Sequence, residues 1–341
     1  MRIRWSSALW FAAFALSADA ASAASFQWSK YAKKADDWFR GQEGTEVVEN
    51  VLSHQSPAGN WPKNVDTAAA RYTGDPQKLR GTFDNGATLG ETRLLARAYK
   101  ATSQARCKEA VIKAVDHILA AQYPTGGWPQ FYPPGKQYHR HITFNDNAMV
   151  NVMNLVRDVA VGKEFDFLDR PRREKAQWAF DRGIACILKC QIVVNGKPTA
   201  WCAQHDEVTL QPRSGRAYEH PSISGAESAG VVRLLMSIEK PSPEVVRAVD
   251  AACRWYQDAK LTGIRQIVRD GDKAIVADPA APPLWARFYE IGTNRPIFSG
   301  RDGVVKYDVA QIEAERRNGY AWYGTWGDGL LKDWAKWKAR R

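Results

Sequence analysis

The sequence predicts an all-α fold, an α/α toroid of three helical hairpins with long loops and few short strands. Three observations favour it: a repeated glutamine-and-turn motif, two amphipathic stretches in each repeat, and Gly and Pro residues that separate these stretches. Few segments show the strict alternation of apolar and polar residues that is typical of a half-buried strand.

A glutamine followed by a glycine-containing turn recurs at nearly constant spacing. The four copies are Gln55 in QSPAGNWP, Gln122 in QYPTGGWP, Gln191 in QIVVNGKPTAW and Gln257 in QDAKLTG. Each glutamine ends a stretch predicted to be helical, at residues 46–54, 107–121, 177–190 and 245–256. Further helices are predicted at 87–100, 147–160 and 226–238, so each period holds two. An open solenoid and a closed ring both fit, and the 14 Trp and 17 Pro gathered at the connections favour the ring.

Three tryptophans, Trp61, Trp128 and Trp201, occupy equivalent turns of the repeat. Aromatic side chains at such positions can pack in the core or offer flat surfaces to a sugar. We interpret them as core residues of the repeat.

The first 23 residues have the pattern of an export signal. Arg2 and Arg4 give a basic start, residues 8–18 form an apolar run, and Ala21-Ser22-Ala23 is a small-residue cleavage site. No later stretch reaches the roughly 20 apolar residues of a membrane-spanning helix. We therefore expect a secreted or periplasmic protein with no membrane partner, and a single domain at 24–341.

The chain is strongly basic, with a formal net charge of +11. This charge predicts a polyanionic partner, although general surface basicity without a partner is the alternative. Nucleic acid would fit the charge, but the sequence contains no basic helix, zinc-ligand spacing or RNA-binding signature. We therefore expect no nucleic-acid partner.

The five cysteines form an odd set for an exported chain, so at least one thiol is expected to be unpaired. Their spacing matches no metal site. Cys186 and Cys190 lie one helical turn apart in an apolar stretch, which favours buried structural thiols. A bridge from Cys190 to Cys202 is possible from the sequence alone.

Two segments place acidic and amide groups just before a predicted helix: Thr82-Phe83-Asp84-Asn85-Gly86 and Thr143-Phe144-Asn145-Asp146-Asn147. Asp and Asn in such places can cap a helix N-terminus. Alternatively, two such ends on one rim of a ring would bring Asp84 and Asp146 together. Clustered carboxylate and amide oxygens are the ligands that Ca²⁺ takes.

Arginines gather in two later loops. Arg213 and Arg216 lie in a loop rich in Pro, Gly and Ser, and Arg287, Arg295 and Arg301 follow among aromatic residues. The planar guanidinium group binds carboxylates bidentately, which suits an anionic substrate. The alternative is that these arginines pair with acidic neighbours, namely Glu219, Glu290 or Asp302.

Histidines offer weaker signals. His139 and His141 flank Arg140, but further ligands at matching spacing are missing, so a metal or acid–base role is disfavoured. His205 and Asp206 lie near Trp201, where ordinary loop polarity is the favoured interpretation.

Across residues 30–331 the chain resembles polysaccharide lyase family 10, the pectate lyases with an (α/α)3 toroid. The motifs that carry the resemblance are, in order, GNWPKN, GTFDNGAT, GGWPQFYP, HITFNDNAM, RAYEHPSISGAES, PLWARFYEI, PIFSGRDG and GYAWYGTWG. Agreement over so many separated motifs is specific. The resemblance implies a catalytic module alone, and we expect it to be a monomer.

The resemblance implies roles for the matching residues. Asp84 and Asp146 would bind Ca²⁺, with Asn85 as a neighbour. Arg216 would be the catalytic residue. The substrate-binding arginines would be Arg287 and Arg301, with Arg213 as a further candidate. The chain departs from the family pattern at Gly215, where a bulkier residue is expected, and at His220, where an apolar one is expected.

The implied activity is calcium-dependent β-elimination of α-1,4-linked polygalacturonate, which leaves 4,5-unsaturated galacturonate ends. The C5 proton becomes removable when the adjacent carboxylate is neutralised, and Ca²⁺ with arginine would supply that neutralisation. Two rival activities are open. A glycoside hydrolase would use Asp84 and Asp146 as its carboxyl pair, and a non-catalytic protein would only bind pectin.

Overall fold

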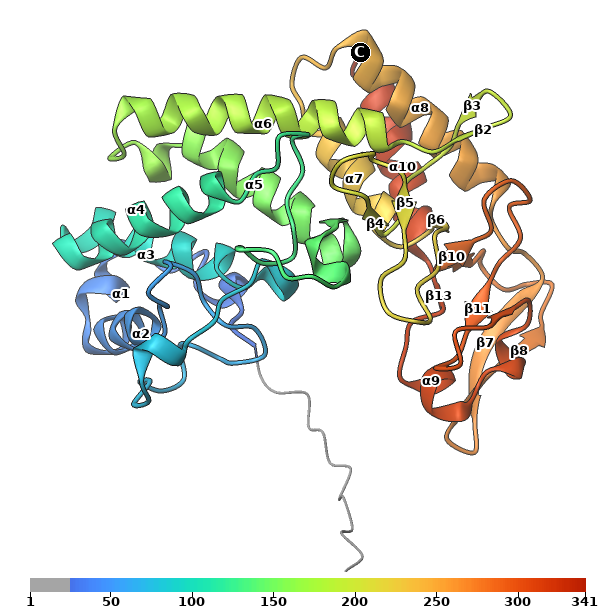
Figure 1. The fold of residues 1–341 in the computed structure, drawn as a ribbon, viewed down its shortest axis with the longest axis horizontal. Helices are drawn as coiled ribbons and strands as arrows, with labels where there is room; N and C mark the ends of the chain where they lie inside the picture. The colour runs from blue at the N-terminus through green and yellow to red at the C-terminus, as the bar shows by residue number, and fades with distance from the viewer. Residues whose placement is uncertain (1–24) are drawn as a thin grey trace, which may run out of the picture.

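Helices are the main elements of the computed structural model, which describes residues 25–341 (Figure 1). The predicted signal peptide, residues 1–23, lies outside the described residues. The helices are α1 (Asp36–Arg40), α2 (Gln42–Ser53), α3 (Leu89–Thr102), α4 (Ala105–Ala120), α5 (Ala148–Val161), α6 (Arg170–Cys190), α7 (Glu227–Met236), α8 (Pro243–Asp258), α9 (Ala314–Asn318) and α10 (Trp326–Ala339). Within the described residues, no helix has the length and apolar character needed to span a membrane.

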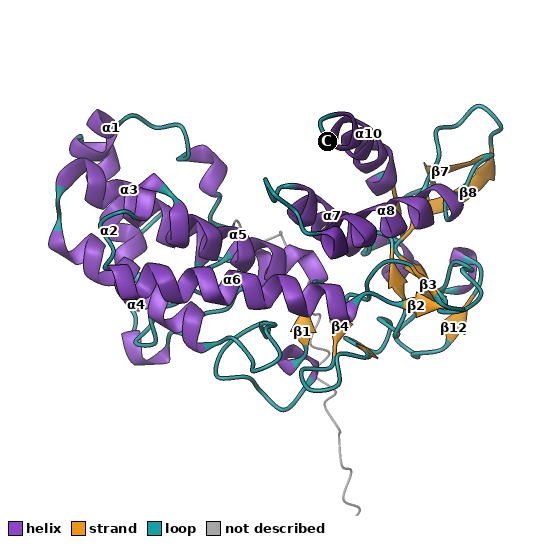
Figure 2. Cartoon of the chain, turned by 90° about the horizontal axis from the view of Figure 1, so that it is seen from above, coloured by secondary structure: helices purple, strands orange, loops and turns teal. Residues whose placement is uncertain are grey.

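Consecutive helices pair into the three hairpins predicted from the sequence. Helix α3 packs on α4, α5 on α6, and α7 on α8. One layer is formed by α3, α5 and α7, which contact each other in order, and a second by α4, α6 and α8 (Figure 2). Helices α1 and α2 pack against α3, while α10 packs against α7 and α8. The hairpins are therefore confirmed, and closure into a toroid stays a prediction.

The repeated glutamine joins one hairpin to the next. Nε2 of Gln55 donates hydrogen bonds to the Gly59 carbonyl in its own turn, at 3.1 Å, and to the Ala110 carbonyl in α4, at 2.9 Å. Gln122 bonds its turn and α6 in the same way, and Gln191 bonds its turn and α8. Each repeated glutamine therefore links its own turn to the second helix of the next hairpin, because its amide donates to one carbonyl in each.

The three equivalent tryptophans lie in the core, as predicted. All three side chains have 0% exposure. The indole N–H of Trp61 donates to the Val51 carbonyl at 2.7 Å, ten residues earlier, and Trp128 and Trp201 make matching bonds at 2.8 Å. Burial of the ring together with a satisfied N–H makes each tryptophan a stable wedge between helix and turn.

Short strands tie the connecting loops together. They are β1 (Ile142–Thr143), β2 (Val193–Val194), β3 (Lys197–Pro198), β4 (Gln204–His205), β5 (Pro212–Arg213), β6 (Ile223–Ser224), β7 (Ile264–Arg269), β8 (Asp272–Ala277), β9 (Trp285–Ala286), β10 (Phe288–Tyr289), β11 (Phe298–Ser299), β12 (Val305–Lys306) and β13 (Tyr323–Gly324). The longest pair is the β7–β8 hairpin. All the pairs are antiparallel, including β1 with β4, β4 with β5, β6 with β10, and β9 with β13. The fold is therefore mainly helical with short strands.

The cysteines are all buried free thiols. The expectation of at least one unpaired thiol is confirmed. The bridge between Cys190 and Cys202 that the sequence allows is not present in the structure. Their burial agrees with a structural role, because a buried thiol behaves as a small apolar side chain.

Candidate active site

Two short turns with the same backbone lie side by side at the start of the site. They are the 3-10 turns η3 (Asp84–Gly86) and η5 (Asn145–Asn147), which pack against each other. Asn85 and Asp146 occupy matching positions with φ values of 53° and 51°. Asn and Asp tolerate this left-handed region better than most side chains. The two turns therefore lie together with the order of their side chains reversed: Asp84 precedes Asn85 in η3, whereas Asn145 precedes Asp146 in η5.

Neither aspartate caps the helix that follows. The N-cap residues are Thr88 for α3 and Asn147 for α5, and neither cap makes a side-chain hydrogen bond. Oδ1 of Asp84 accepts from the Asn85 amide at 3.0 Å, and Oδ2 pairs with Lys63. The capping interpretation of these two motifs is wrong, because the carboxylates are engaged elsewhere.

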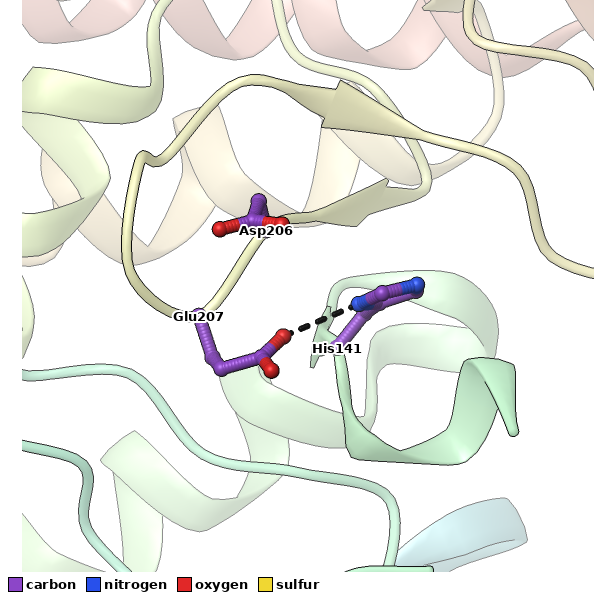
Figure 3. Close-up of side chains that lie close together, drawn as sticks. All are labelled: His141, Asp206 and Glu207. Atoms are coloured by element: carbon purple, nitrogen blue, oxygen red, sulfur yellow. Dashed lines mark hydrogen bonds and ion pairs between the residues drawn. The ribbon is translucent and has the colours of Figure 1, made fainter. Parts of the chain in front are cut away.

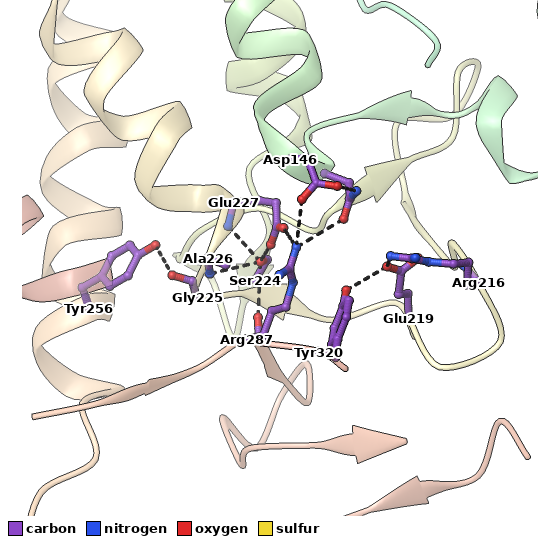
Figure 4. A network of polar contacts seen from close by, with 11 residues as sticks. Asp146, Arg216, Glu219, Ser224, Gly225, Ala226, Glu227, Tyr256, Arg287 and Tyr320 are labelled. Carbon is purple, nitrogen blue, oxygen red and sulfur yellow. Dashed lines mark hydrogen bonds and ion pairs between the residues drawn. The ribbon is translucent and has the colours of Figure 1, made fainter. Parts of the chain in front are cut away.

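Arg287 connects the second turn to α7. Strand β10, beside Arg287, pairs with β6, which leads into the helix that begins at Glu227. Nη2 of Arg287 pairs with Glu227, and it lies 3.5 Å from Oδ1 of Asp146 and 3.4 Å from Oδ1 of Asn145 (Figure 4). Its Nε, also buried, has no hydrogen-bond partner among the described residues. This guanidinium donor is therefore available to an acceptor that enters the site.

The ion pair with Glu227 keeps Arg287 charged. Burial by itself lowers the pKa of Arg287, but the charges of Glu227, Asp146 and Glu219 and the adjacent Tyr320 together outweigh burial, and the pKa lies above the ordinary value. Ser224 donates to the other Glu227 oxygen, which fixes the carboxylate. A pocket of about 210 Å³ beside these groups is lined by Asp146, Arg287 and Trp326 among others.

Arg216 lies on the facing loop and is held by Glu219. Its guanidinium pairs with Oε1 of Glu219, its backbone N–H donates to Oε2 at 2.8 Å, and Tyr320 donates to Oε1 at 2.8 Å. Although burial lowers the pKa of Arg216, the hydrogen bond and charge of Glu219, together with Tyr320 and Tyr218, raise the pKa above the usual range. The alternative that these arginines pair with acidic neighbours is therefore confirmed for Arg216.

Three guanidinium groups lie near the ring of Tyr320 at cation–π distance. Cζ of Arg287 lies 4.6 Å from the ring centre, and the corresponding distance is 5.6 Å for both Arg216 and Arg316. Cations favour the negative face of an aromatic ring. Nε of Arg316 is buried and has no partner among the described residues. The site thus contains several guanidinium groups, each beside a carboxylate, and the buried Nε atoms of Arg287 and Arg316 are the donors that a substrate carboxylate could use.

Direct contacts bring the parts of the site together, because η3 packs against η5, Arg287 lies beside Asp146, and Arg287 and Arg216 share the ring of Tyr320. Burial is the main reason that the pKa of Tyr138 is raised, and the charges of Arg216 and Glu219 act on it together with those of Lys63 and Asp84. The hydroxyl therefore lies near both the Arg216 loop and the Asp84 turn. Asp84, Asp146, Arg216 and Arg287 belong to one region of the surface.

Arg301 and Arg213 lie outside the network around Arg287. Arg301 makes a bidentate pair with Glu315, with both distances 2.9 Å, and its side chain is 65% exposed. Its loop adjoins the Arg216 loop, since a Cβ built on Gly303 would lie 3.5 Å from the Ala217 carbonyl oxygen. Arg213 pairs with Asp206 at 2.8 Å. The substrate roles of Arg301 and Arg213 remain predictions.

The departure at Gly215 has a structural reason. A Cβ at this position would lie 2.4 Å from Oε2 of Glu219 and 2.8 Å from Oε1 of Gln204. Because glycine has no Cβ, the Glu219 carboxylate can contact both the backbone and the side chain of Arg216 without a steric clash. At His220, the other departure, burial lowers the pKa and Nε2 has no partner among the described residues.

A second cluster with metal-ligand chemistry contains His141, Asp206 and Glu207 (Figure 3). Nδ1 of His141 lies 3.0 Å from Oε2 of Glu207, so the structure supplies the neighbours that the sequence did not reveal. Each carboxylate already has a cation, because Arg140 pairs with Glu207 at 2.5 Å and Arg213 with Asp206. Asp206 is the better satisfied, since hydrogen bonds led by the Thr209 amide hold its pKa far below the usual range. His205 is buried, and burial lowers its pKa to about 4.

The donors around Asp84 and Asp146 fit calcium. Ca²⁺ takes six to eight oxygen ligands from carboxylates, amides and water. The two packed turns offer two carboxylates, with the amide side chains of Asn85, Asn145 and Asn147 beside them. Lys63 and Arg287 neutralise the same carboxylates, so an ion bound there would compete with these cations.

Comparison with known proteins identifies the class of this chain as a polysaccharide lyase. The chain matches the family model of pectic acid lyase over residues 55–331. The family 10 polysaccharide lyase from Cellvibrio cellulosa is similar, with 36% identity and a TM-score of 0.78 over 88% of this chain and 94% of that one. A mutant of that enzyme in complex with trigalacturonic acid has 36% identity and a TM-score of 0.79, over 88% and 95% of the two chains. Among curated protein sequences, none matches significantly.

The chain therefore belongs to the pectic acid lyase family, and it is a lyase that acts on pectate. The resemblance to polysaccharide lyase family 10 is confirmed. Sequence reasoning missed several groups that build the site, namely Lys63, Glu227, Arg316 and Tyr320. Glu219 had been considered only as a surface partner of an arginine. Its position three residues after Arg216 was the available signal. Lys63, Glu227 and Tyr320 lie within the motifs GNWPKN, RAYEHPSISGAES and GYAWYGTWG that carry the resemblance, which was their signal, whereas Arg316 lies outside these motifs.

Proposed function

We propose that the protein cleaves polygalacturonate by calcium-dependent β-elimination and leaves 4,5-unsaturated galacturonate ends. The observation that supports this best is the convergence of Asp146, Arg287 and Glu227 beside the Asp84 turn, with a buried Arg287 donor still unused. Such a site offers fixed positive charge to a substrate carboxylate before the reaction begins, and preorganised charge is usually the largest catalytic contribution.

In this proposal the arginines bind and orient the uronate. Arg287 donates to the carboxylate attached to C5, which withdraws charge from the carbanion that forms when the C5 proton leaves. Arg301 and Arg213 bind carboxylates of neighbouring sugars. A calcium ion held by Asp84, Asp146 and Asn85 would neutralise the same acidic substrate and so lower the barrier to proton removal.

Arg216 is proposed as the group that takes the C5 proton. The electron pair of the C5–H bond then forms the C4–C5 double bond, the C4–O bond breaks, and the departing oxygen takes a proton from water. The Glu219 pair opposes this role, because it favours the protonated guanidinium. Proton transfer therefore requires a bound state in which nearby cations outweigh Glu219, and the rate should increase with pH.

Export and ring closure belong to the same proposal. The signal-like residues 1–23 and the basic composition suit an enzyme that meets an extracellular polyanion as a monomer. The three stacked hairpins would close into an (α/α)3 toroid, and their pairwise packing is compatible with this closure.

One assay tests the activity. Purified protein is mixed with polygalacturonate in calcium or in excess chelator, and ultraviolet absorbance is followed. We expect absorbance from unsaturated uronate in calcium and none in chelator. Reducing ends without absorbance would instead indicate a glycoside hydrolase that uses Asp84 and Asp146. Polymer binding without either product would indicate a pectin-binding protein.

A further inference from the structure

A groove of about 630 Å³ lies next to the Asp84 turn. Its walls come from the turn at residues 56–60, the segment at 77–81 and the loop at 131–133. Phe131 and Tyr132 present partly exposed rings to it, and Leu79 is buried in its wall. This volume is within the range of small-molecule sites, which are mainly apolar with a few polar groups. Aromatic faces of this kind attract the C–H face of a sugar ring.

Arg80 is the cation of this groove. Its Nη1 donates to the carbonyl oxygens of Gln77, at 2.6 Å, and Leu79, at 2.9 Å. No carboxylate among residues 25–341 forms an ion pair with it, whereas Arg216, Arg287 and Arg301 each have an acidic partner. The guanidinium is held in place by its own segment while other N–H groups stay available. That geometry suits bidentate binding of a carboxylate.

Two segments lead from the groove to the site. Residues 80–84 connect Arg80 to Asp84, and four residues span at most about 14 Å. Asn60, in the groove, is followed by Lys63, which pairs with Asp84. The Gln130 carbonyl, next to Phe131, accepts hydrogen bonds from Phe83 N and Thr82 Oγ1 at 2.9 and 2.8 Å. Short backbone connections and hydrogen bonds therefore fix the groove next to the Asp84 turn.

We propose that this groove is a distal subsite that binds a further uronate residue of the pectate chain. Arg80 binds the carboxylate of that sugar, and Phe131 with Tyr132 contacts its apolar face. Every sugar of pectate carries a carboxylate. When one sugar lies near Asp84, another sugar of the same chain can therefore place its carboxylate in the groove. The inference rests on the proposed function and adds one contact that sets preference for chain length.

The test compares oligogalacturonates of increasing length. We expect kcat/KM of the unmodified enzyme to rise when the chain becomes long enough to fill the groove. Arg80→Ala should abolish this rise, so that kcat/KM on the longer oligomers falls by about tenfold, as expected for loss of a charge-assisted pair. Shorter oligomers should be cleaved equally well by both. Arg80→Lys should recover part of the step, and Phe131→Ala should reduce it.

The matched control is Arg269→Ala, which removes the same charge from an exposed position in the β7–β8 hairpin. It should leave the length dependence unchanged. The subsite is refuted if Arg80→Ala lowers the rate equally at every length or behaves like Arg269→Ala. Calorimetric binding of long and short oligomers to Arg216→Ala, with and without Arg80→Ala, gives a readout that does not need turnover. It therefore separates failure of the subsite from failure of the proposed lyase activity.

Discussion

The guanidinium of Arg287 lies 3.5 Å from the carboxylate of Asp146, although the two residues are 141 positions apart. The contact joins a loop after α8 to the turn before α5, and the same guanidinium pairs with Glu227 at the start of α7. Three segments that are distant in the sequence, those with Asp146, Glu227 and Arg287, therefore meet at the Arg287 guanidinium. A substrate carboxylate that reaches Arg287 is placed directly beside the oxygens proposed to hold calcium.

Replacement of Arg287 by lysine should reduce kcat by about 10²–10³, the usual cost of losing one preorganised donor in the transition state. Lysine keeps the charge near Glu227 but cannot bind two acceptors in one plane. The rate of unsaturated product formation checks this. Thermal unfolding of the variant is the control, and a variant that folds yet retains full activity would contradict the role of Arg287.

Replacement of Arg216 by lysine tests the proton transfer. The reference pKa is about 12.5–13.8 for arginine and about 10.4 for lysine. If residue 216 takes the C5 proton, Arg216→Lys should move the alkaline rise of kcat about two pH units lower. The measurement is kcat between neutral and strongly alkaline pH. A variant with an unshifted profile would show that Arg216 acts only as a cation.

Gly215→Ala should disturb the same loop by steric means. The new Cβ would lie 2.4 Å from Oε2 of Glu219, which must then move away from Arg216. We expect activity to fall at least tenfold, because loss of the contact that positions Arg216 outweighs the easier deprotonation of its guanidinium. The melting temperature should change by only a few degrees, because Gly215 lies in a partly exposed loop. Steady-state kinetics and thermal unfolding check the two parts. Full activity would mean that the Glu219 contact has no part in catalysis.

Local patterns in the sequence were sufficient to predict the helices of the three hairpins. The three hairpins have helical periodicity, and each core tryptophan bonds a carbonyl only 10 or 14 residues earlier. By contrast, α10 and the β7–β8 hairpin were not predicted. The hairpin's outward side chains, such as Val268 at 68% exposure, do not follow an alternating pattern.

The candidate site was predictable only in part. The two turns with Asp84 and Asp146 share a sequence pattern, which indicated their equivalence. The partners Glu227 and Tyr320 reach Arg287 through the pairing of β6 with β10 and the position of the loop after α9. Both residues lie within motifs that carry the family resemblance, but the motifs do not indicate which distant residue each side chain contacts.

Glu91 makes stability depend on pH. It is fully buried in α3, its Oε2 has no partner among the described residues, and burial raises its pKa from 4.5 to about 7. The folded state therefore holds the proton more tightly than the unfolded chain. This contribution to stability is complete below about pH 4.5 and is lost as the pH rises through about 7, by roughly 3 kcal/mol.

Glu91→Gln should accordingly unfold at a higher temperature than the unmodified protein at pH 8 and at a similar temperature at pH 4. The amide keeps the shape of the side chain and cannot ionise. Calorimetric melting over this range checks the difference, with Glu174→Gln on the exposed face of α6 as the control. Equal pH dependence of both proteins would show that Glu91 is not the group responsible.

Lys63 should compete with calcium for Asp84. The ammonium group pairs with Oδ2 of this buried carboxylate. Lys63→Gln removes the competing charge, and we therefore expect a calcium dissociation constant at least several-fold lower, measured by titration calorimetry without substrate. Asp84→Asn and Asp146→Asn should weaken binding by at least tenfold, since each removes one charged oxygen ligand. If Lys63→Gln bound calcium no more tightly and Asp84→Asn no more weakly, the ion would have to lie elsewhere, and His141, Asp206 and Glu207 would be the next group to replace.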